Sequence, residues 1–438
     1  MKKIINKNWS IITFLILTII LILLNKDIIF KAYLHAEDGW FLNDAMDKGI
    51  GSLFMKNGGY FIVLSRISSI IAVLFGRMFS SIIVSANILK FISIIICAFS
   101  INYLNTKEFE WLIKNKYVRL LLSVSLMTVM TNFAWMAYNC VAIHWWGGTL
   151  IFLISLNLIN NRLPSYWIIP FAILCILSSA SVMPLGLAIV YYLYKQINFK
   201  KSVKENLKSF KKEQIYKLLL LFLPLVIQAL SILTNNSNIN STVSSLSFTY
   251  IIQLISKIFG IILVNPVYIF GVSTFKILYN LNLIKVVSMI LWCVILYLSL
   301  KIKKTKDLIC AVIYIFAIYF MISFKFPNAL SFDWSESYYY SLPVFIICFE
   351  FFVLLFKNFK KNNIYLYFLI LIFFCYTNYE NRYPIDFVAN DSLQKIDKYV
   401  DFESNKYINV EISPNHEWQI KVPINDEFCE EYGCEKSV

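Results

Sequence analysis

Residues 80–103 read SSIIVSANILKFISIIICAFSINY, an apolar run in which Lys90 is the only charged side chain. A helix needs about 20 mostly apolar residues to cross the ~30 Å hydrocarbon core of a bilayer, because each residue advances it by about 1.5 Å. Similar runs recur along the whole chain. Its 438 residues are 59% hydrophobic and only 15% charged, which excludes an ordinary cytosolic globular protein.

Eleven apolar segments are predicted to span a membrane as helices. They are 9–30, 80–103, 119–139, 142–160, 166–181, 182–195, 217–234, 281–300, 307–324, 340–357 and 364–378. The first is predicted to be retained, because no small-residue cleavage site follows it. We therefore expect residues 1–378 to form an all-α polytopic membrane protein with about eleven transmembrane helices.

The basic residues predict the orientation of these spans, because Lys and Arg concentrate in cytoplasmic loops. Of the 40 Lys and Arg residues, 23 lie in the N-terminal segment and in every second gap between spans. This pattern places the N-terminus in the cytoplasm and the C-terminus outside the plasma membrane. The net charge of +14 therefore belongs to short loops and does not indicate a nucleic-acid partner.

Two further apolar stretches, 60–76 and 249–280, would reverse this charge pattern if they crossed the membrane. Asn265-Pro266 also interrupts the second stretch. We expect both to form interfacial or re-entrant juxtamembrane helices on the outer side. The substantial outer segments are then 31–79, 235–280, 325–339 and 379–438.

The tail 379–438 differs in composition from the rest, with 13 acidic residues and no membrane-length run. Residues 407–424 predict two short strands around a Ser-Pro-Asn turn, and hence a small extracytoplasmic β-rich tail. Cys429 and Cys434 lie in this tail, where an oxidising compartment would allow them to form a small disulfide loop.

The first outer loop, 31–79, contains His35-Ala36-Glu37-Asp38-Gly39-Trp40-Phe41. Two adjacent carboxylates lie a few residues beyond a membrane exit, beside a glycine that allows a turn and aromatic side chains suited to the interface. They are candidate catalytic residues. The alternative is a solvated loop in which Asp38 caps a helix.

This loop and other motifs resemble the GT-C class of integral-membrane glycosyltransferases, and more narrowly a family of bacterial polytopic glycosyltransferases. The motifs are AEDGWF at 36–41, GGYFIVLSRISSIIAVLF at 58–75, Asn139 with His144-Trp145, SVMPLGL at 181–187, SYYYSLP at 337–343 and NVEISPNHEWQIKVP at 409–423. The chain departs from the family at Glu336-Ser337, where an Arg is expected before the tyrosines. This departure argues against a phosphate-binding role for that segment.

The resemblance implies transfer of a sugar from a polyprenyl-phosphate carrier to a cell-surface glycan or glycolipid. The attacking hydroxyl must lose a proton, which requires a carboxylate as general base. Direct displacement by that hydroxyl predicts inversion at the anomeric carbon. We expect Asp38 to be the base. Glu37 is the alternative base, or a helper that binds a sugar hydroxyl or a divalent metal ion.

The lipid phosphate leaving group needs cations near the membrane surface. Arg66, Arg77 and Lys56 in the first outer loop are the candidates, and Lys325 is a weaker one. The alternative for each is a side chain that only anchors a helix at the interface.

The candidate sugar-binding or acceptor-binding residues are His144, Trp145 and Asn139, together with Tyr138. Tyr339, in the run 338–340, is a further candidate. All of these residues could instead belong to an aromatic belt at the membrane interface.

Two charges inside predicted spans, Lys90 and Glu350, are predicted to lie at the same depth and to pair. The chain lacks nucleotide-binding motifs and a large cytosolic domain, which disfavours a nucleotide-sugar donor. A polymerase or ligase of lipid-linked glycans and a transporter or flippase remain the alternatives. The single acidic loop and the scarcity of mid-span charges favour chemistry at a membrane face over transport.

Overall fold

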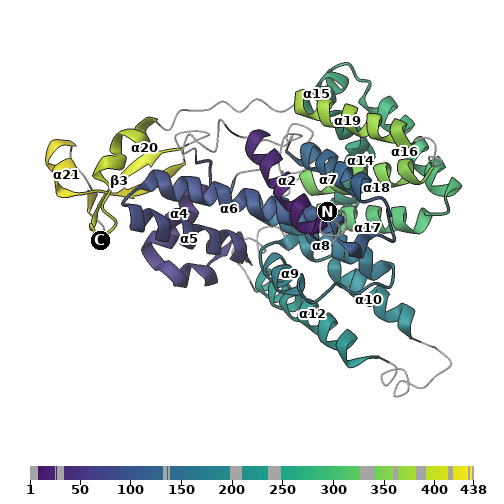
Figure 1. The fold of residues 1–438 in the computed structure, drawn as a ribbon, viewed down its shortest axis with the longest axis horizontal. Helices are drawn as coiled ribbons and strands as arrows, with labels where there is room; N and C mark the ends of the chain where they lie inside the picture. Colours follow the sequence, from purple (N-terminus) through teal and green to yellow (C-terminus); the bar gives the residue numbers. More distant parts are fainter. Residues whose placement is uncertain are drawn as a thin grey trace. The chain divides into compact units, whose positions relative to one another are not determined.

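The computed structural model is mostly helical, with a small β-containing tail (Figure 1). It describes residues 8–24, 26, 34–131, 136, 139–197, 210–234, 248–325, 340–358, 364–380, 391–412, 418–432 and 435–436. The chain divides into two compact units, each described by itself. The larger unit comprises Met1–Thr13, Ser100–Ala134 and Trp145–Tyr383, and the smaller comprises Phe14–Phe99, Trp135–His144 and Pro384–Val438.

Six helical segments of the described chain are long and apolar enough to cross a membrane. They are Ile82–Asn105, Lys212–Leu233, Ile252–Phe270, Ile284–Lys301, Thr305–Ser323 and Ser341–Asn358. All but Ile252–Phe270 coincide with predicted spans. Ile252–Phe270 lies in the stretch predicted to be re-entrant. Here α14 (Phe248–Val264) leads directly into the 3-10 helix η5 (Asn265–Phe270). Pro266 lies in the first turn of η5, where a proline disrupts no helix interior, so the two helices can follow one another without a gap.

The other predicted spans form shorter helices. Four of them lie on the segments 9–30, 119–139, 142–160 and 364–378: α2 (Trp9–Leu24), α7 (Lys116–Met130), α8 (Ile143–Ile159) and α19 (Ile364–Glu380).

The predicted pair 166–181 and 182–195 forms α9 (Ile169–Ile176) and α10 (Leu185–Gln196), of 8 and 12 residues. At about 1.5 Å per residue, neither can cross a ~30 Å core alone. A turn at Leu177-Ser178, the short 3-10 helix η4 (Ala180–Val182) and Pro184 separate the two helices. The structure therefore does not establish eleven spans.

Helix α18 (Ser341–Asn358) forms the core of the larger unit, and nearly all of its side chains are buried. It packs against α7, α19, α16 (Ile284–Lys301) and α17 (Thr305–Lys325). By contrast, α12 (Lys212–Leu233) and α16 leave many large apolar side chains exposed, among them Leu223 and Met289. So much exposed apolar surface would be unfavourable in water, so these faces indicate a membrane environment.

The first outer loop of the sequence forms the framework of the smaller unit. Helix α4 (Asp38–Lys48) leads through the 3-10 helix η1 (Gly49–Phe54) into the hairpin of β1 (Lys56–Asn57) and β2 (Tyr60–Phe61). Gly58 and Gly59 supply the positive φ angles that a tight hairpin turn requires. The chain then continues into α5 (Val63–Phe79), which packs against α4, and α6 (Ile82–Asn102).

Helix α5 confirms the helix predicted over 60–76, and it buries several polar side chains while it leaves large apolar ones exposed. Its buried face carries Ser65, Arg66 and Ser68, whereas Leu74 and Met78 are exposed. A soluble helix buries its apolar stripe instead. This distribution is expected of a helix whose outer face contacts lipid.

The tail contains α20 (Asp391–Ile396), the 3-10 helix η9 (Asp397–Tyr399), β3 (Lys406–Glu411), β4 (Gln419–Pro423), α21 (Asp426–Tyr432) and β5 (Glu435–Lys436). Strands β3 and β4 are antiparallel, with Val410 opposite Ile420, which confirms the two predicted strands. The predicted turn at 413–417 lies outside the described residues. Cys429 is disulfide-bonded, and Cys434 also lies outside the described residues.

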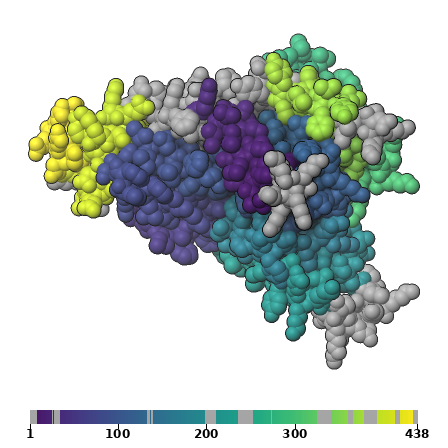
Figure 2. All heavy atoms as spheres, in the orientation of Figure 1, coloured from purple at the N-terminus to yellow at the C-terminus, as the bar shows by residue number. Residues whose placement is uncertain are grey.

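The tail packs within the smaller unit, where β4 contacts α4, and the tail is coloured yellow in Figure 2. The Asp397 carboxylate accepts hydrogen bonds from Ser81 Oγ at 2.8 Å and from the Ile83 backbone N–H at 3.1 Å, at the N-terminus of α6. A carboxylate is favourable there because the first N–H groups of a helix lack partners within the helix. The tail is therefore part of the framework that carries the acidic loop.

Candidate functional site

A tight turn brings the chain into α4 and places the two acids. Ala36 has a φ of +50°, and Glu37 occupies the N-cap position. Asp38 is the first residue of α4 and is only 1% exposed. Its Oδ1 accepts a hydrogen bond from the Cys140 backbone N–H at 2.8 Å, and its Oδ2 accepts one from the His35 N–H at 3.1 Å. Asp38 is therefore neither a solvated loop residue nor a conventional helix cap.

The turn at 139–142 holds the acidic loop from the other side. Asn139 Nδ2 donates to the His35 carbonyl at 3.1 Å, and Asn139 Oδ1 accepts from the Val141 N–H at 2.6 Å. Asn139 is fully buried. Asn139 thus lies at the acidic loop, as a shared site requires. Its side-chain amide, however, is hydrogen-bonded to the backbone of His35 and Val141.

Burial controls the titration of this loop. Desolvation raises the pKa of Asp38 to about 7, against the opposing effects of its two N–H donors and the Lys90 charge. Desolvation also raises the pKa of Glu37, whose side chain is only partly buried. Burial lowers the pKa of His35 to about 3, so its imidazole is neutral at physiological pH.

Lys90 provides the positive charge near Asp38. It lies in α6, is fully buried and interacts electrostatically with Asp38. Glu350 belongs to the larger unit, where its charged neighbours are Asp307, Lys304 and Lys357. The predicted Lys90–Glu350 pair joins residues of different units and stays a prediction. Each charge has a partner within its own unit.

The three candidate phosphate-binding residues differ in availability. Arg66 is 4% exposed, forms an ion pair with Asp44 at 2.5 Å and lies 4.5 Å from the centre of the Phe41 ring. Its charge is thus already balanced. Arg77 is exposed and donates to the Met46 carbonyl at 3.2 Å.

Lys56 is exposed on β1, with its Nζ 5.6 Å from the centre of the Phe61 ring. Arg77 and Lys56 are therefore the accessible cations among the three. The side chain of Lys325, the weaker phosphate-binding candidate, lies outside the described part of the structure.

The predicted sugar-binding residues are mostly buried. His144 and Trp145 are each 3% exposed, and they fall in different units. Tyr138 and Tyr339 lie outside the described residues. Tyr340 is buried and packs against the rings of Tyr268 and Tyr319. Among the described members of this set, none forms an open sugar-binding wall.

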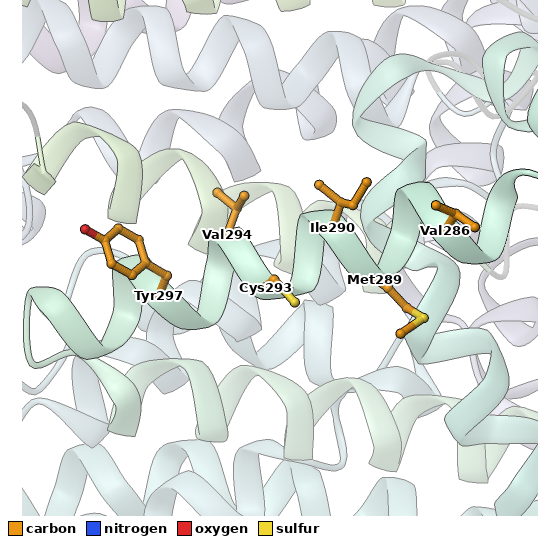
Figure 3. Close-up of a pocket in the computed structure, with 6 residues that line it drawn as sticks. All are labelled: Val286, Met289, Ile290, Cys293, Val294 and Tyr297. Atoms are coloured by element: carbon orange, nitrogen blue, oxygen red, sulfur yellow. The ribbon is translucent and has the colours of Figure 1, made fainter.

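No cluster of three His, Cys, Asp or Glu side chains suited to a metal ion occurs in the described part of the chain. A groove of about 650 Å³ runs along α16 (Figure 3). Its lining is apolar apart from the Cys293 thiol and the Tyr297 hydroxyl. Such a groove suits a lipid chain and offers no acid or base for catalysis.

Sequence reasoning missed three features of the smaller unit. It identified Lys90 as an unusual charge but not its place near Asp38, because only the fold shows that α6 passes beside Asp38. It did not identify Asp44 as the counter-ion of Arg66. It also treated the tail as separate from the acidic loop, although Lys421 contacts Asn43 directly.

Comparisons with protein-family models, with curated proteins and with solved structures found no match. The fold and the site therefore define this chain only as a helical membrane protein in which a buried Asp38 and a partly buried Glu37 lie next to a small β-containing tail. Its activity has to be argued from the site itself.

Proposed function

We propose that this chain is a membrane glycosyltransferase that moves a sugar from a polyprenyl-phosphate carrier to a cell-surface glycan or glycolipid. The observation that carries the proposal is the Glu37–Asp38 pair, which is held in place by backbone hydrogen bonds at the start of α4. Buried carboxylates with perturbed pKa values concentrate at functional sites. The resemblance of residues 36–41 to the GT-C acidic loop supplies the reaction class.

The two acids take different roles in this proposal. A general base must come within hydrogen-bond reach of the acceptor hydroxyl. Asp38 is almost fully buried, and both of its oxygens already accept backbone N–H groups, whereas Glu37 is only partly buried. We therefore assign Glu37 as the base, and Asp38 as a positioning residue that fixes the first turn of α4. The raised pKa of Glu37 makes it a stronger base than a solvated glutamate.

The reaction is a single displacement. The acceptor hydroxyl loses its proton to Glu37 and attacks the anomeric carbon, while the bond from that carbon to the phosphate oxygen breaks. The anomeric configuration inverts, and the polyprenyl phosphate leaves with the bonding electrons. Lys56 is the accessible cation assigned to that phosphate, because Arg77 already donates to the Met46 carbonyl. The exposed apolar face of α5 would keep the site at headgroup level.

The proposed location is the plasma membrane, with the N-terminus in the cytoplasm, the C-terminus outside and about eleven spans. The concentration of basic residues in alternate gaps supports this orientation. Single cysteines at Lys56→Cys and Lys303→Cys, in a background lacking Cys293, test it. An impermeant maleimide should label the first from outside intact cells and the second only after permeabilisation. Labelling of the second from outside would indicate a crossing by Ile252–Phe270 or a single crossing by residues 166–195, and either would refute this topology.

The activity test uses the full chain in liposomes with a panel of polyprenyl-phosphate sugars, after cell-surface glycans have been compared with and without the gene. Glu37→Gln should lower transfer by about 100-fold or more, because it removes the base. Glu110→Gln, an exposed acid in the larger unit, is the matched control and should transfer normally. Full activity of Glu37→Gln would refute the assignment of the base. Movement of the lipid across the bilayer without cleavage of the sugar bond would refute transfer.

A further inference from the structure

The tail packs along the helix that carries the acid pair. The Lys421 N–H donates to Asn43 Oδ1 at 2.9 Å, and the rings of Trp40 and Trp418 lie 4.4 Å apart. A Cβ atom on Gly39 would lie 2.6 Å from the Gln419 carbonyl oxygen, so only glycine allows this approach. Strand β4 is therefore fixed against α4 within one compact unit.

A pocket of about 230 Å³ opens between the end of α4, the end of α5 and the tail. We call it the α4–tail pocket. Its polar lining includes Asp47, Arg77, Glu403, Asn405 and Lys421. Pockets for drug-sized ligands hold roughly 300–1,000 Å³, so this one fits a single small unit of a ligand.

The charges that line the α4–tail pocket nearly cancel. Lys406 is already paired with Asp426 at 2.6 Å. The remaining cations, Arg77 and Lys421, are matched by the two carboxylates Asp47 and Glu403. A site built for a phosphate group would carry an excess of positive charge. This balance favours an uncharged polar ligand.

The chemistry of the lining matches a sugar. Each sugar hydroxyl both donates and accepts hydrogen bonds, and the lining offers Arg77 and Lys421 as donors and Asp47 and Glu403 as acceptors. The Tyr407 ring also lines the pocket, with Lys421 Nζ 5.0 Å from its centre, so the ring and this ammonium group form one side of the pocket.

The position of the α4–tail pocket connects it to the acid pair. Trp40 follows Glu37 by three residues. Its side chain is 50% exposed and packs against the ring of Trp418. Asp47 lies ten residues beyond Glu37, which is about 15 Å along the helix axis. An extended glycan with one end at Glu37 could therefore pass the exposed indole of Trp40 and place another sugar residue in the pocket.

We propose that the α4–tail pocket binds an uncharged, non-reacting sugar residue of the acceptor glycan, with the Trp40–Trp418 pair as the stacking surface between the pocket and the acid pair. The role of acceptor rests on the proposed glycosyltransferase function. Binding of the sugar itself does not depend on that function, so the two can be tested separately.

The test measures binding of neutral oligosaccharides to the purified full chain in nanodiscs, with inorganic phosphate as competitor. The probes are oligosaccharides of glucose, galactose, mannose, rhamnose and N-acetylglucosamine, and tryptophan fluorescence is the readout. The double variant Arg77→Gln/Glu403→Gln should weaken binding of the best probe by about tenfold or more, because it removes charged hydrogen-bonding groups. Trp40→Phe should weaken it less, and should remove most of the fluorescence change.

Glu430→Gln, on an exposed residue of α21 outside the pocket, is the matched control and should bind normally. Thermal unfolding of each variant confirms that it is folded. Glu37→Gln should bind the probe as the wild type does, which separates binding from catalysis. The proposal is overturned if no neutral oligosaccharide binds, if the double variant binds as tightly as the wild type, or if phosphate displaces the probe. Normal transfer by Glu37→Gln would overturn the assigned base and leave the pocket standing.

Discussion

The replacement Asp38→Asn tests how the acid pair is held, because it removes a buried charge and keeps the side-chain shape. Desolvation raises the pKa of Asp38 from 3.8 to about 7. At about 1.4 kcal/mol per pKa unit, the buried carboxylate destabilises the folded protein by ~4 kcal/mol when it is ionised. The amide avoids this cost. However, it has only one oxygen for the N–H groups of Cys140 and His35, and leaving one of them unsatisfied costs about 1–3 kcal/mol.

The sign of the effect depends on pH. Below about pH 4 Asp38 is protonated in both the folded and the unfolded chain, so only the lost hydrogen bond counts and the variant is less stable. Between pH 4 and 7 the unfolded carboxyl ionises while the buried one holds its proton. The wild type therefore loses stability as pH rises towards 7, and the variant does not.

The assay is reversible unfolding in mixed micelles between pH 4 and 8. The free energy of unfolding of Asp38→Asn, relative to wild type, should rise by up to ~4 kcal/mol across this range. A difference that stays constant to within about 1 kcal/mol, or that falls with pH, would refute the account of a buried charge.

Two further predictions concern packing in the smaller unit. Asp44→Asn should destabilise the protein by about 3 kcal/mol, because it leaves the buried Arg66 guanidinium without its counter-ion, and adding Arg66→Met should recover part of the loss in the same unfolding assay. If Arg66→Met restored no stability, loss of the ion pair would not be the cause of the destabilisation. Gly39→Ala should loosen the tail, at a cost of about 1–3 kcal/mol, because its Cβ would meet the Gln419 carbonyl. Limited proteolysis should then cut the tail faster, whereas Gly51→Ala, whose Cβ would make only an ordinary 3.9 Å contact with Lys48 Cβ, should match the wild type.

The sequence predicts most helices because apolar runs and charged gaps are local properties. The segments 80–103 and 340–357 each form a long apolar helix, and residues 407–424 form the expected strand pair. Span counting fails where local chemistry interrupts a run. Residues 166–195 contain enough apolar residues for one or two spans, but Pro184 and the turn before it divide them into two short helices.

The acid pair could be located from the sequence, but its surroundings could not. Lys90 and Asp38 are 52 residues apart, and Asn139 is about 100 residues from the acidic loop. No local pattern encodes such contacts. The exposure difference between Glu37 and Asp38 also depends on the turn at 139–142. For this reason the sequence predicted Asp38 as the base, whereas we propose Glu37.

The hydrogen bond between Lys421 and Asn43 joins residues separated by 378 positions. At about 5–20 residues per second, a ribosome needs roughly 20–75 s to make the chain between them. During that time α4 has already been synthesised, but the strand that packs on it does not yet exist. A product released early by a stalled ribosome would carry Glu37 and Asp38 without β4, and its uncovered helix would be open to membrane-quality-control proteases.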